Sequence, residues 1–468
     1  MQLWIEWWKV AVQLRPACSR TRTFMWLLLA LAGISVRSDL LGVTSVVRSL
    51  GLFDKCYKQI LDFFHTDAID PGHLSKVWTQ IALRIFPTKM RVNGKLVLLG
   101  DGIKVPKAGR KMPAVKSLHQ ESDSNTKPEY IMGHSCQAVS LVVGAEDSAF
   151  AVPLATRIHE GVVFSNRDER TLMNKMISLI ELLGLAEPFY FVADAYYASK
   201  TIALELLAAG NHLVTRIRCN AVAYWPAIQP KNGRRKRGRP KMYGKKVKLF
   251  SLFDDAKEMI RAASPVYGEV DVMIKYRVVD MVWKPLKRLV RFVLVDHPTR
   301  GKTIFMTTDI QLDPIDVIRL YGIRYKIELS FKQALRIVGA FGYHFWMKWM
   351  KPIERFSGDQ YLHHESARYR DAVRRKIMAY HRYIQIGLIA QGLLQYLSVQ
   401  FPALVWENFG SWLRTIRPGI PPSELVVAQA LRASLPEFLA GRNSAASFTK
   451  FLLERTDVSR SEGLRLAG

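Results

Sequence analysis

Three acidic residues in this sequence, Asp101, Asp194 and Glu328, have the side-chain types and settings that metal-assisted chemistry needs. Asp101 closes the apolar run 96–100 and Asp194 closes the apolar run 189–193, and both runs are typical of buried strands. Glu328 falls in a segment patterned as a helix. Three carboxylates can hold two divalent ions, and two such ions can cut and join a phosphodiester. We therefore expect a two-metal site formed by these three side chains.

Each acid also has an ordinary local interpretation. Asp101 is followed by Gly102, and Asp-Gly is a strong hairpin signal. Asp194 could cap the helix that follows it, and Glu328 could pair with Lys332 at i+4. Taken singly, these local roles are the commoner ones. The order of strand and acid, strand and acid, then helix and acid is what favours a shared metal site.

The segment around Glu328 places further polar groups on one side of a helix. At ~100° per residue, Tyr321, Arg324 and Glu328 lie within about 60° of one another. The guanidinium of Arg324 could grip a phosphate with its fork of donors, and the hydroxyl of Tyr321 could bind the same group. The alternative is a surface cluster that serves only solubility.

The composition indicates a folded protein with a polyanionic partner. Among the 468 residues, 68 are Lys or Arg and 40 are Asp or Glu, which gives a net charge of +28. The obvious polyanion is DNA; a ribosomal or membrane-surface protein is the alternative. Apolar residues make up 49% of the chain, which excludes a disordered basic tail.

The elements that must position the acids indicate an α/β fold, a mixed sheet flanked by helices. Strands are expected at 96–101, 138–143, 150–154, 189–194 and 212–217, with helices at 168–183 and 201–209. Strand-like runs at 270–279 and 289–295 indicate a β-rich insertion, after which a short strand at 303–307 and a helix opened by Asp313-Pro314 resume the core. The predicted organisation is a helical DNA-binding region (1–88), a catalytic core (89–218), a basic β-rich insertion (219–302), the rest of the core (303–345) and a helical C-terminal region for DNA contact or dimerisation (346–468).

Two features bear on location. The apolar run 24–36 is shorter than the ~20 residues of a membrane helix, so we interpret it as a buried helix rather than a signal peptide. The four cysteines are too few for a disulfide scaffold and lack zinc-site spacing, which indicates a reducing cytoplasm.

The insertion carries candidate DNA contacts. Residues 231–248 contain ten Lys or Arg and no acid. Within them, Arg237-Gly-Arg239-Pro240 is similar to an AT-hook core, which enters A·T-rich minor grooves. A basic loop that holds phosphates without sequence preference is the alternative. The candidate phosphate contacts in this run are Arg234, Arg235, Arg237 and Arg239. Trp283 could stack on an unpaired base, or it could simply belong to the core.

With these residues the chain resembles the DDE transposases of bacterial insertion sequences, in the branch with an RNase H-like core. That branch has a Tyr-(2)-Arg-(3)-Glu-(6)-Lys signature, which Tyr321, Arg324 and Glu328 match, and it places a β-rich insertion between its second and third acids. Residues 109–122 and 133–134 are also similar to family members. The signature's Lys is replaced by Leu335, and Lys332 is the nearest substitute.

The resemblance implies an RNase H-like fold, and it implies Asp101, Asp194 and Glu328 as ligands of two Mg²⁺ ions, with Mn²⁺ as a substitute. Tyr321 and Arg324 would hold the phosphate of the transposon end. The implied partners are terminal inverted repeats and target DNA, bound by a homodimer without a membrane, in a bacterial cytoplasm and at its nucleoid. Two alternatives are an RNase H-like DNA endonuclease without strand transfer and a catalytically decayed DNA-binding protein.

Overall fold

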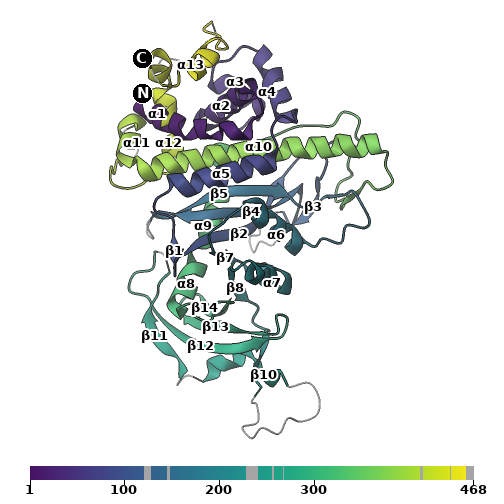
Figure 1. Cartoon of the computed structure of the whole chain (residues 1–468), viewed down its shortest axis with the longest axis vertical. Helices are drawn as coiled ribbons and strands as arrows, with labels where there is room; N and C mark the ends of the chain where they lie inside the picture. Colours follow the sequence, from purple (N-terminus) through teal and green to yellow (C-terminus); the bar gives the residue numbers. More distant parts are fainter. Residues whose placement is uncertain are drawn as a thin grey trace.

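The computed structural model describes residues 1–120, 128–144, 148–227, 241–255, 258–266, 268–411, 415–442 and 444–459. Through this part of the chain runs a mixed sheet of thirteen strands, with a helical layer at one end of the molecule and the insertion strands at the other (Figure 1). The main path of the sheet is β10 (Tyr243–Lys248), β9 (Val222–Pro226), β12 (Met273–Trp283), β13 (Arg288–His297), β14 (Gly301–Thr307), β8 (His212–Ile217), β7 (Phe189–Ala193), β2 (Lys95–Pro106), β4 (Tyr130–Val143) and β3 (Lys116–His119).

Three further strands join the sheet from the side: β1 (Arg91–Val92) on β2, β5 (Phe150–Ile158) on β4 and β11 (Ile260–Ala263) on β12. Strands β5, β4 and β2 are antiparallel to one another, whereas β2, β7 and β8 are parallel. This order is that of an RNase H-like core, so the predicted α/β class is confirmed.

The strands predicted from the apolar runs are present, and β8 has the predicted bounds. The prediction that the first strand ends at Asp101 is wrong, because β2 continues to Pro106 and pairs with β4 over that length. The hairpin interpretation of Asp101-Gly102 is therefore wrong as well. Long pairing with β4 outweighs the local turn preference of Asp-Gly.

Apolar residues alternate along β2, and each face of the sheet has its own core. Leu96 and Leu98 belong to the larger core, and Val97 and Leu99 belong to the smaller one. Helices of the larger core include α5 (Pro71–Ile85), α6 (Leu172–Leu182), α7 (Lys200–Ala208) and α10 (Ala367–Gln400), and those of the smaller core are α8 (Pro314–Ile323) and α9 (Tyr325–Gln333). Helix α8 thus packs on the face opposite α10, whereas α9 also contacts α10, because Nε2 of Gln391 donates to the carbonyl of Ser330 at 3.0 Å.

The insertion is not a separate sheet. Strand β14 pairs with β13 on one side and with β8 on the other, so the insertion strands continue the core sheet. The short strand predicted at 303–307 is β14, next to β8 as the resumed core requires.

The helical regions predicted at the two ends of the chain form one layer (Figure 1). The indole N–H of Trp4 donates to the carbonyl of Leu431 at 2.9 Å, and the ring of Trp4 stacks on Phe438 at 5.3 Å between centroids. The helices of this layer beside α5 and α10 are α1 (Gln2–Ala11), α2 (Thr21–Val36), α3 (Val43–Ser49), α4 (Lys55–His65), α11 (Pro402–Phe409), α12 (Glu424–Ala440) and α13 (Ala446–Leu453).

The apolar run 24–36 lies in α2, which is buried over nearly its whole length, as predicted. Within the described ranges, no single helix combines the length and apolar character of a membrane span. The pair α10 and α11 has both together, but the two helices meet at a bend of 103°. Most of the second half of α10 is buried inside the protein.

Candidate active site

Asp101 lies inside β2, with a glycine on either side. Its Oδ1 accepts a hydrogen bond from the N–H of Gly102 at 2.8 Å, and its Oδ2 accepts one from Nη1 of Arg324 at 2.8 Å. A Cβ on Gly100 would lie 2.0 Å from Cζ of Phe191. The strand therefore needs glycine before Asp101 to pass this buried ring.

Asp194 follows β7 directly and lies beside Asp101. Strands β2 and β7 are parallel, and Gly100 lies opposite Ala193. Asp101 follows Gly100 and Asp194 follows Ala193, so the two aspartates are neighbours across the strands. Neighbouring strands are ~4.8 Å apart, so the two aspartates lie side by side where the parallel pairing of β2 and β7 ends. We call this end of the parallel strands the sheet edge. Oδ1 of Asp194 also accepts from the N–H of Tyr196 at 3.0 Å, so the predicted capping role is confirmed as well.

Glu328 reaches the aspartates through Arg324. Nη2 of Arg324 donates to Oε1 of Glu328 at 2.6 Å, while Nη1 holds Asp101. Pairing with Lys332 was the local alternative for Glu328; the ion pair seen in the structure is with Arg324. One guanidinium thus brings together the first and third of the predicted acids.

The predicted single helix divides at Arg324, between α8 and α9. The N–H of Arg324 donates to the carbonyl of Tyr321, and the N–H of Ile327 donates to the carbonyl of Arg324, at 3.2 and 3.1 Å. This spacing of three residues marks a tightened turn, which often accompanies a functional site. Asp313 caps the first helix and Pro314 opens it, as predicted.

The electrostatics of the site centre on Asp101. Burial raises the pKa of this carboxyl to about 6, and the negative charges of Asp194 and Glu328 act in the same direction. Arg324 and the N–H of Gly102 oppose the shift without cancelling it. The carboxylates therefore lie close enough to repel one another, and the site attracts positive charge.

The donor set fits hard divalent cations, because carboxylate oxygens are the ligands that Mg²⁺ and Mn²⁺ prefer. Within the described part of the chain, no three His, Cys, Asp or Glu side chains stand close enough to share one ion as they lie. Asp101 and Glu328 meet instead through the guanidinium of Arg324. A metal site here would require Arg324 to turn away from at least one carboxylate.

Tyr321 lies beside Arg324, whose guanidinium carbon is 5.8 Å from the centre of its ring. Burial raises the pKa of the Tyr321 hydroxyl, and the positive charges of Arg324 and Arg216 oppose this shift. Arg216 is an exposed residue of β8, next to Thr215, whose Oγ1 donates to the carbonyl of Asp194 at 2.8 Å. Sequence reasoning missed Arg216, although a charged residue within an apolar strand marked it.

Beyond Glu328 the helix changes its winding. Lys332, the substitute for the signature's Lys, is an exposed residue of α9. Leu335 is half-buried against the larger core, in a π-helical turn over Ala334–Val338. Arg336 in the same turn is exposed and lies four residues after Lys332. The position of the signature's Lys is thus used for packing, with two cations near it on the surface.

The DNA contacts predicted for the insertion involve four arginines and one tryptophan. Arg234, Arg235, Arg237 and Arg239 lie outside the described residues. Trp283 is only 7% exposed and packs in the larger core at the end of β12. The prediction that it stacks on an unpaired base is therefore wrong, and the core interpretation is correct.

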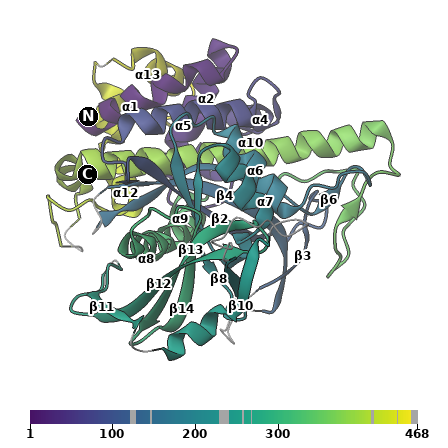
Figure 2. The ribbon, with the colours of Figure 1, turned by 60° about the horizontal axis from the view of Figure 1, so that its bottom comes forward.

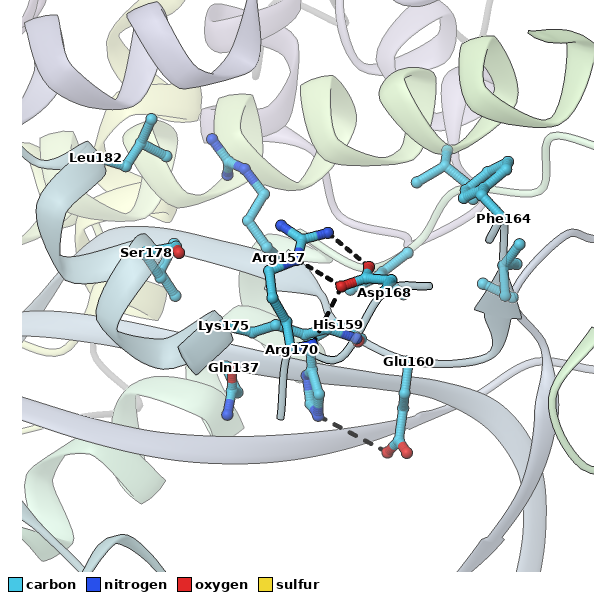
Figure 3. Close-up of a pocket in the computed structure, with 15 residues that line it drawn as sticks. Gln137, Arg157, His159, Glu160, Phe164, Asp168, Arg170, Lys175, Ser178 and Leu182 are labelled. Carbon is cyan, nitrogen blue, oxygen red and sulfur yellow. Dashed lines mark hydrogen bonds and ion pairs between the residues drawn. The ribbon is translucent and has the colours of Figure 1, made fainter. Parts of the chain in front are cut away.

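A cavity of about 350 Å³ opens elsewhere, between β5, β6 (Val162–Val163) and α6 (Figure 3). None of the three candidate acids lines it. Its own acids are paired: Asp168 with Arg170 at 2.8 Å, and Glu160 with Lys116 at 3.1 Å. Because the three candidate acids lie elsewhere, the region around Asp101 and Asp194 remains the candidate active site.

Comparison with known proteins supports a nuclease of the DDE type. A family model described as DDE superfamily endonuclease matches residues 13–271, which is more than half of the chain. The match contains Asp101, Asp194 and the start of the insertion, and it ends before Glu328. Among curated proteins, none matches this chain.

Proposed function

The chain belongs to the DDE superfamily endonucleases, and from this we propose that it is a DNA transposase that cuts transposon ends and joins their 3′-hydroxyls to target DNA. The observation that carries the proposal is the parallel register of β2 and β7, which sets Asp101 beside Asp194, together with the contacts of Arg324 to Asp101 and Glu328. The contacts of Arg324 support including Glu328, which lies outside the family match, in one site with Asp101 and Asp194.

Asp101, Asp194 and Glu328 would hold two Mg²⁺ ions, with Mn²⁺ as a substitute. Such ions, when bound, lower the pKa of an attacking water or 3′-hydroxyl and stabilise the leaving oxygen. The protein itself contributes the burial of Asp101. Burial destabilises the unpaired carboxylate and so favours its binding to a cation.

Arg324, Tyr321 and Arg216 form the positive side of the same site. We propose that Arg324 exchanges a carboxylate for a phosphate oxygen when DNA binds, because its fork suits either group. The hydroxyl of Tyr321 and the guanidinium of Arg216 would hold the same phosphate from the side of β8. Lys332 and Arg336 would contact the backbone further along.

The net charge of +28 supports DNA as the partner. We propose that the protein acts as a homodimer on two transposon ends, in the cytoplasm and at the nucleoid of a bacterium. The basic run 231–248 would add contacts to the phosphates of the same DNA.

The experiment uses purified full-length protein and a labelled duplex that carries the inverted repeat flanking this reading frame, with a plasmid as target. We expect cleavage at the repeat in Mg²⁺ or Mn²⁺, followed by joining of the 3′-end to the plasmid. Cleavage without joining would identify an endonuclease without strand transfer. Absence of metal-dependent cleavage on any duplex would leave the decayed DNA-binding protein as the answer.

A further inference from the structure

Two tryptophans, Trp346 and Trp349, lie on the surface of the segment between the π-helical turn and β15 (Gln360–Tyr361). They are 65% and 81% exposed, although tryptophan is usually a highly buried residue. Buried and exposed residues alternate along 341–348, with positions 344, 346 and 348 turned outward. The exposure of Trp346 thus follows from the course of the backbone.

This segment is fastened to the loop that follows β2. The N–H of Met347 donates to the carbonyl of Lys111 at 2.9 Å, and the N–H of Ile353 donates to the carbonyl of Arg110 at 2.7 Å. Nε of Arg110 in turn donates a hydrogen bond to the carbonyl of Ile353 at 3.0 Å. The side chains of Met347 and Ile353 are buried, so apolar packing supports both of these backbone hydrogen bonds. The tryptophans are therefore presented by a fixed support.

Lys107 fastens the segment at its start. Its Nζ donates to the carbonyls of Phe341 and Tyr343 and lies 3.7 Å from the centre of the Tyr343 ring. His134 bonds the hydroxyl of Tyr343 through Nδ1 at 2.6 Å. These contacts tie the segment to β2 and β4, the strands that also carry and flank Asp101.

The surroundings of the two tryptophans are basic. Residues 104–120 contain five Lys or Arg and no Asp or Glu, and residues 341–358 contain three and one Glu. Nζ of Lys348 lies 5.0 Å from the centre of the Trp349 ring. We call Trp346, Trp349, Lys111, Lys348 and Lys351 the tryptophan platform, and all five are exposed.

The platform is within reach of DNA held at the acids. Lys111 is ten residues from Asp101 along β2 and its following loop, so the two are at most about 35 Å apart. At 3.4 Å per nucleotide this is about ten nucleotides of a strand. Figure 2 shows β3 and β6, the neighbours of this region, on the side of the molecule where α10 begins.

We propose that the tryptophan platform binds unpaired bases of DNA that passes the candidate active site, with the tryptophans stacking on bases and the lysines holding phosphates. Exposed aromatic rings combined with positive charge are the means by which proteins bind single strands. The charge of the platform is complementary to phosphates. The inference rests on the proposed function, because DNA that is cut at the acids would present a free strand end to the platform.

The test is equilibrium binding by the full-length protein in EDTA, so that cleavage plays no part. One labelled duplex is blunt, and the other carries a single-stranded tail of about 6 nucleotides. We expect wild type to bind the tailed duplex more tightly. Trp346→Ala and Trp349→Ala should each weaken that binding by about 10-fold and affect the blunt duplex much less. Trp346→Phe and Trp349→Phe should restore most of the affinity.

Tyr57→Ala is the matched control, because Tyr57 is an exposed aromatic residue on α4. Equal losses on the blunt and tailed duplexes, or no loss on either, would overturn the inference. So would loss of binding to anionic lipid vesicles, or dissociation of a dimer, in the two alanine variants. If tail binding behaves as expected but no metal-dependent cleavage exists, the platform stands and the proposed function fails.

Discussion

Arg324 and Asp101 form a mostly buried ion pair, with Nη1 and Oδ2 2.8 Å apart, although 223 residues separate them in sequence. The same guanidinium binds Glu328, one turn further along. A single cation therefore balances two carboxylates that would otherwise repel each other across the sheet edge. This pair links the packing of α8 and α9 to the position of Asp101 on β2.

The first prediction concerns this cation. Arg324→Gln should raise the affinity for Mn²⁺ by about 10-fold, roughly 1.4 kcal/mol, because a positive charge that competes for the carboxylates is removed. The same change should lower cleavage, since the phosphate loses its bidentate partner. Calorimetric titration of Mn²⁺ at pH 8 measures the affinity. Arg84→Gln on α5 is the control, and a weaker Mn²⁺ affinity in Arg324→Gln would contradict the proposed competition.

The second prediction concerns the acids. Asp101→Asn, Asp194→Asn and Glu328→Gln should each lower metal-dependent cleavage by about 1,000-fold or more, because an amide cannot replace a carboxylate ligand of a divalent ion. Binding of the same duplex in EDTA should be retained. Single-turnover rates give the first quantity, and gel shift gives the second. Glu181→Gln, at an exposed acid of α6, is the control; a normal rate in any of the three variants removes that residue from the site.

The third prediction concerns Gly100. Gly100→Ala should destabilise the fold by about 1–3 kcal/mol, because its Cβ would overlap the buried ring of Phe191 and one of the two must shift. Denaturant unfolding at one pH measures the change. Gly419→Ala meets no neighbouring atom within 4 Å and serves as the control. Equal stability of the two variants would show that the ring relaxes without cost.

The fourth prediction concerns the basic run. Replacing Arg234, Arg235, Arg237 and Arg239 by Ala should flatten the dependence of log affinity on log salt by up to ~0.9 for each phosphate that the variant no longer neutralises. Affinities for one duplex at several salt concentrations give the slope, and the four replaced residues lie outside β10. The control replaces four exposed Lys or Arg of the N-terminal helices. An unchanged slope in the first variant would exclude the run from the interface.

The fifth prediction concerns Lys107, whose pKa burial lowers from 10.5 to about 7. Between these values the unfolded chain binds this proton and the folded chain does not, so the stability from this residue rises with pH. Lys107→Met loses the hydrogen bonds of Nζ at every pH but also removes this pH dependence, so its stability relative to wild type should fall by up to about 4 kcal/mol between pH 7 and pH 10. Denaturant unfolding at pH 7, 8.5 and 10 measures the difference.

The titratable neighbours of Lys107 do not interfere in this range. Burial lowers the pKa of His134 to about 3 and raises that of Cys136 to about 12, and burial also lowers the pKa of His344. Burial holds the pKa of Tyr343 well above its usual value. Lys200→Met, at an exposed position of α7, is the control. A difference between Lys107→Met and wild type that is constant with pH would contradict the assignment.

The elements around the site could be predicted because their signals are local. Apolar runs marked β7 and β8, and Asp313-Pro314 marked the start of α8. That Arg324 and Glu328 lie on the same face could be predicted from their spacing, since the two residues are one helical turn apart and form an ion pair.

What the sequence did not reveal depends on distant contacts. The extension of β2 past Asp101 requires the pairing with β4, which no local pattern encodes. The break between α8 and α9 occurs at Arg324, the residue that binds the distant Asp101, and the burial of Trp283 depends on how the insertion folds onto the core. The exposure of Trp346 depends on a loop more than 200 residues earlier in the chain.

The continuity of the sheet has a mechanical consequence. Seven residue pairs join β13 to β14 and four join β14 to β8, so the described strands of the insertion are held to the core by continuous backbone pairing. Tension on a duplex held at the insertion, as the proposed function requires, would pass through these rows of backbone bonds to the strand beside β7, which Asp194 follows. Bending of DNA bound in this way would therefore be coupled, through one continuous sheet, to the alignment of the carboxylates.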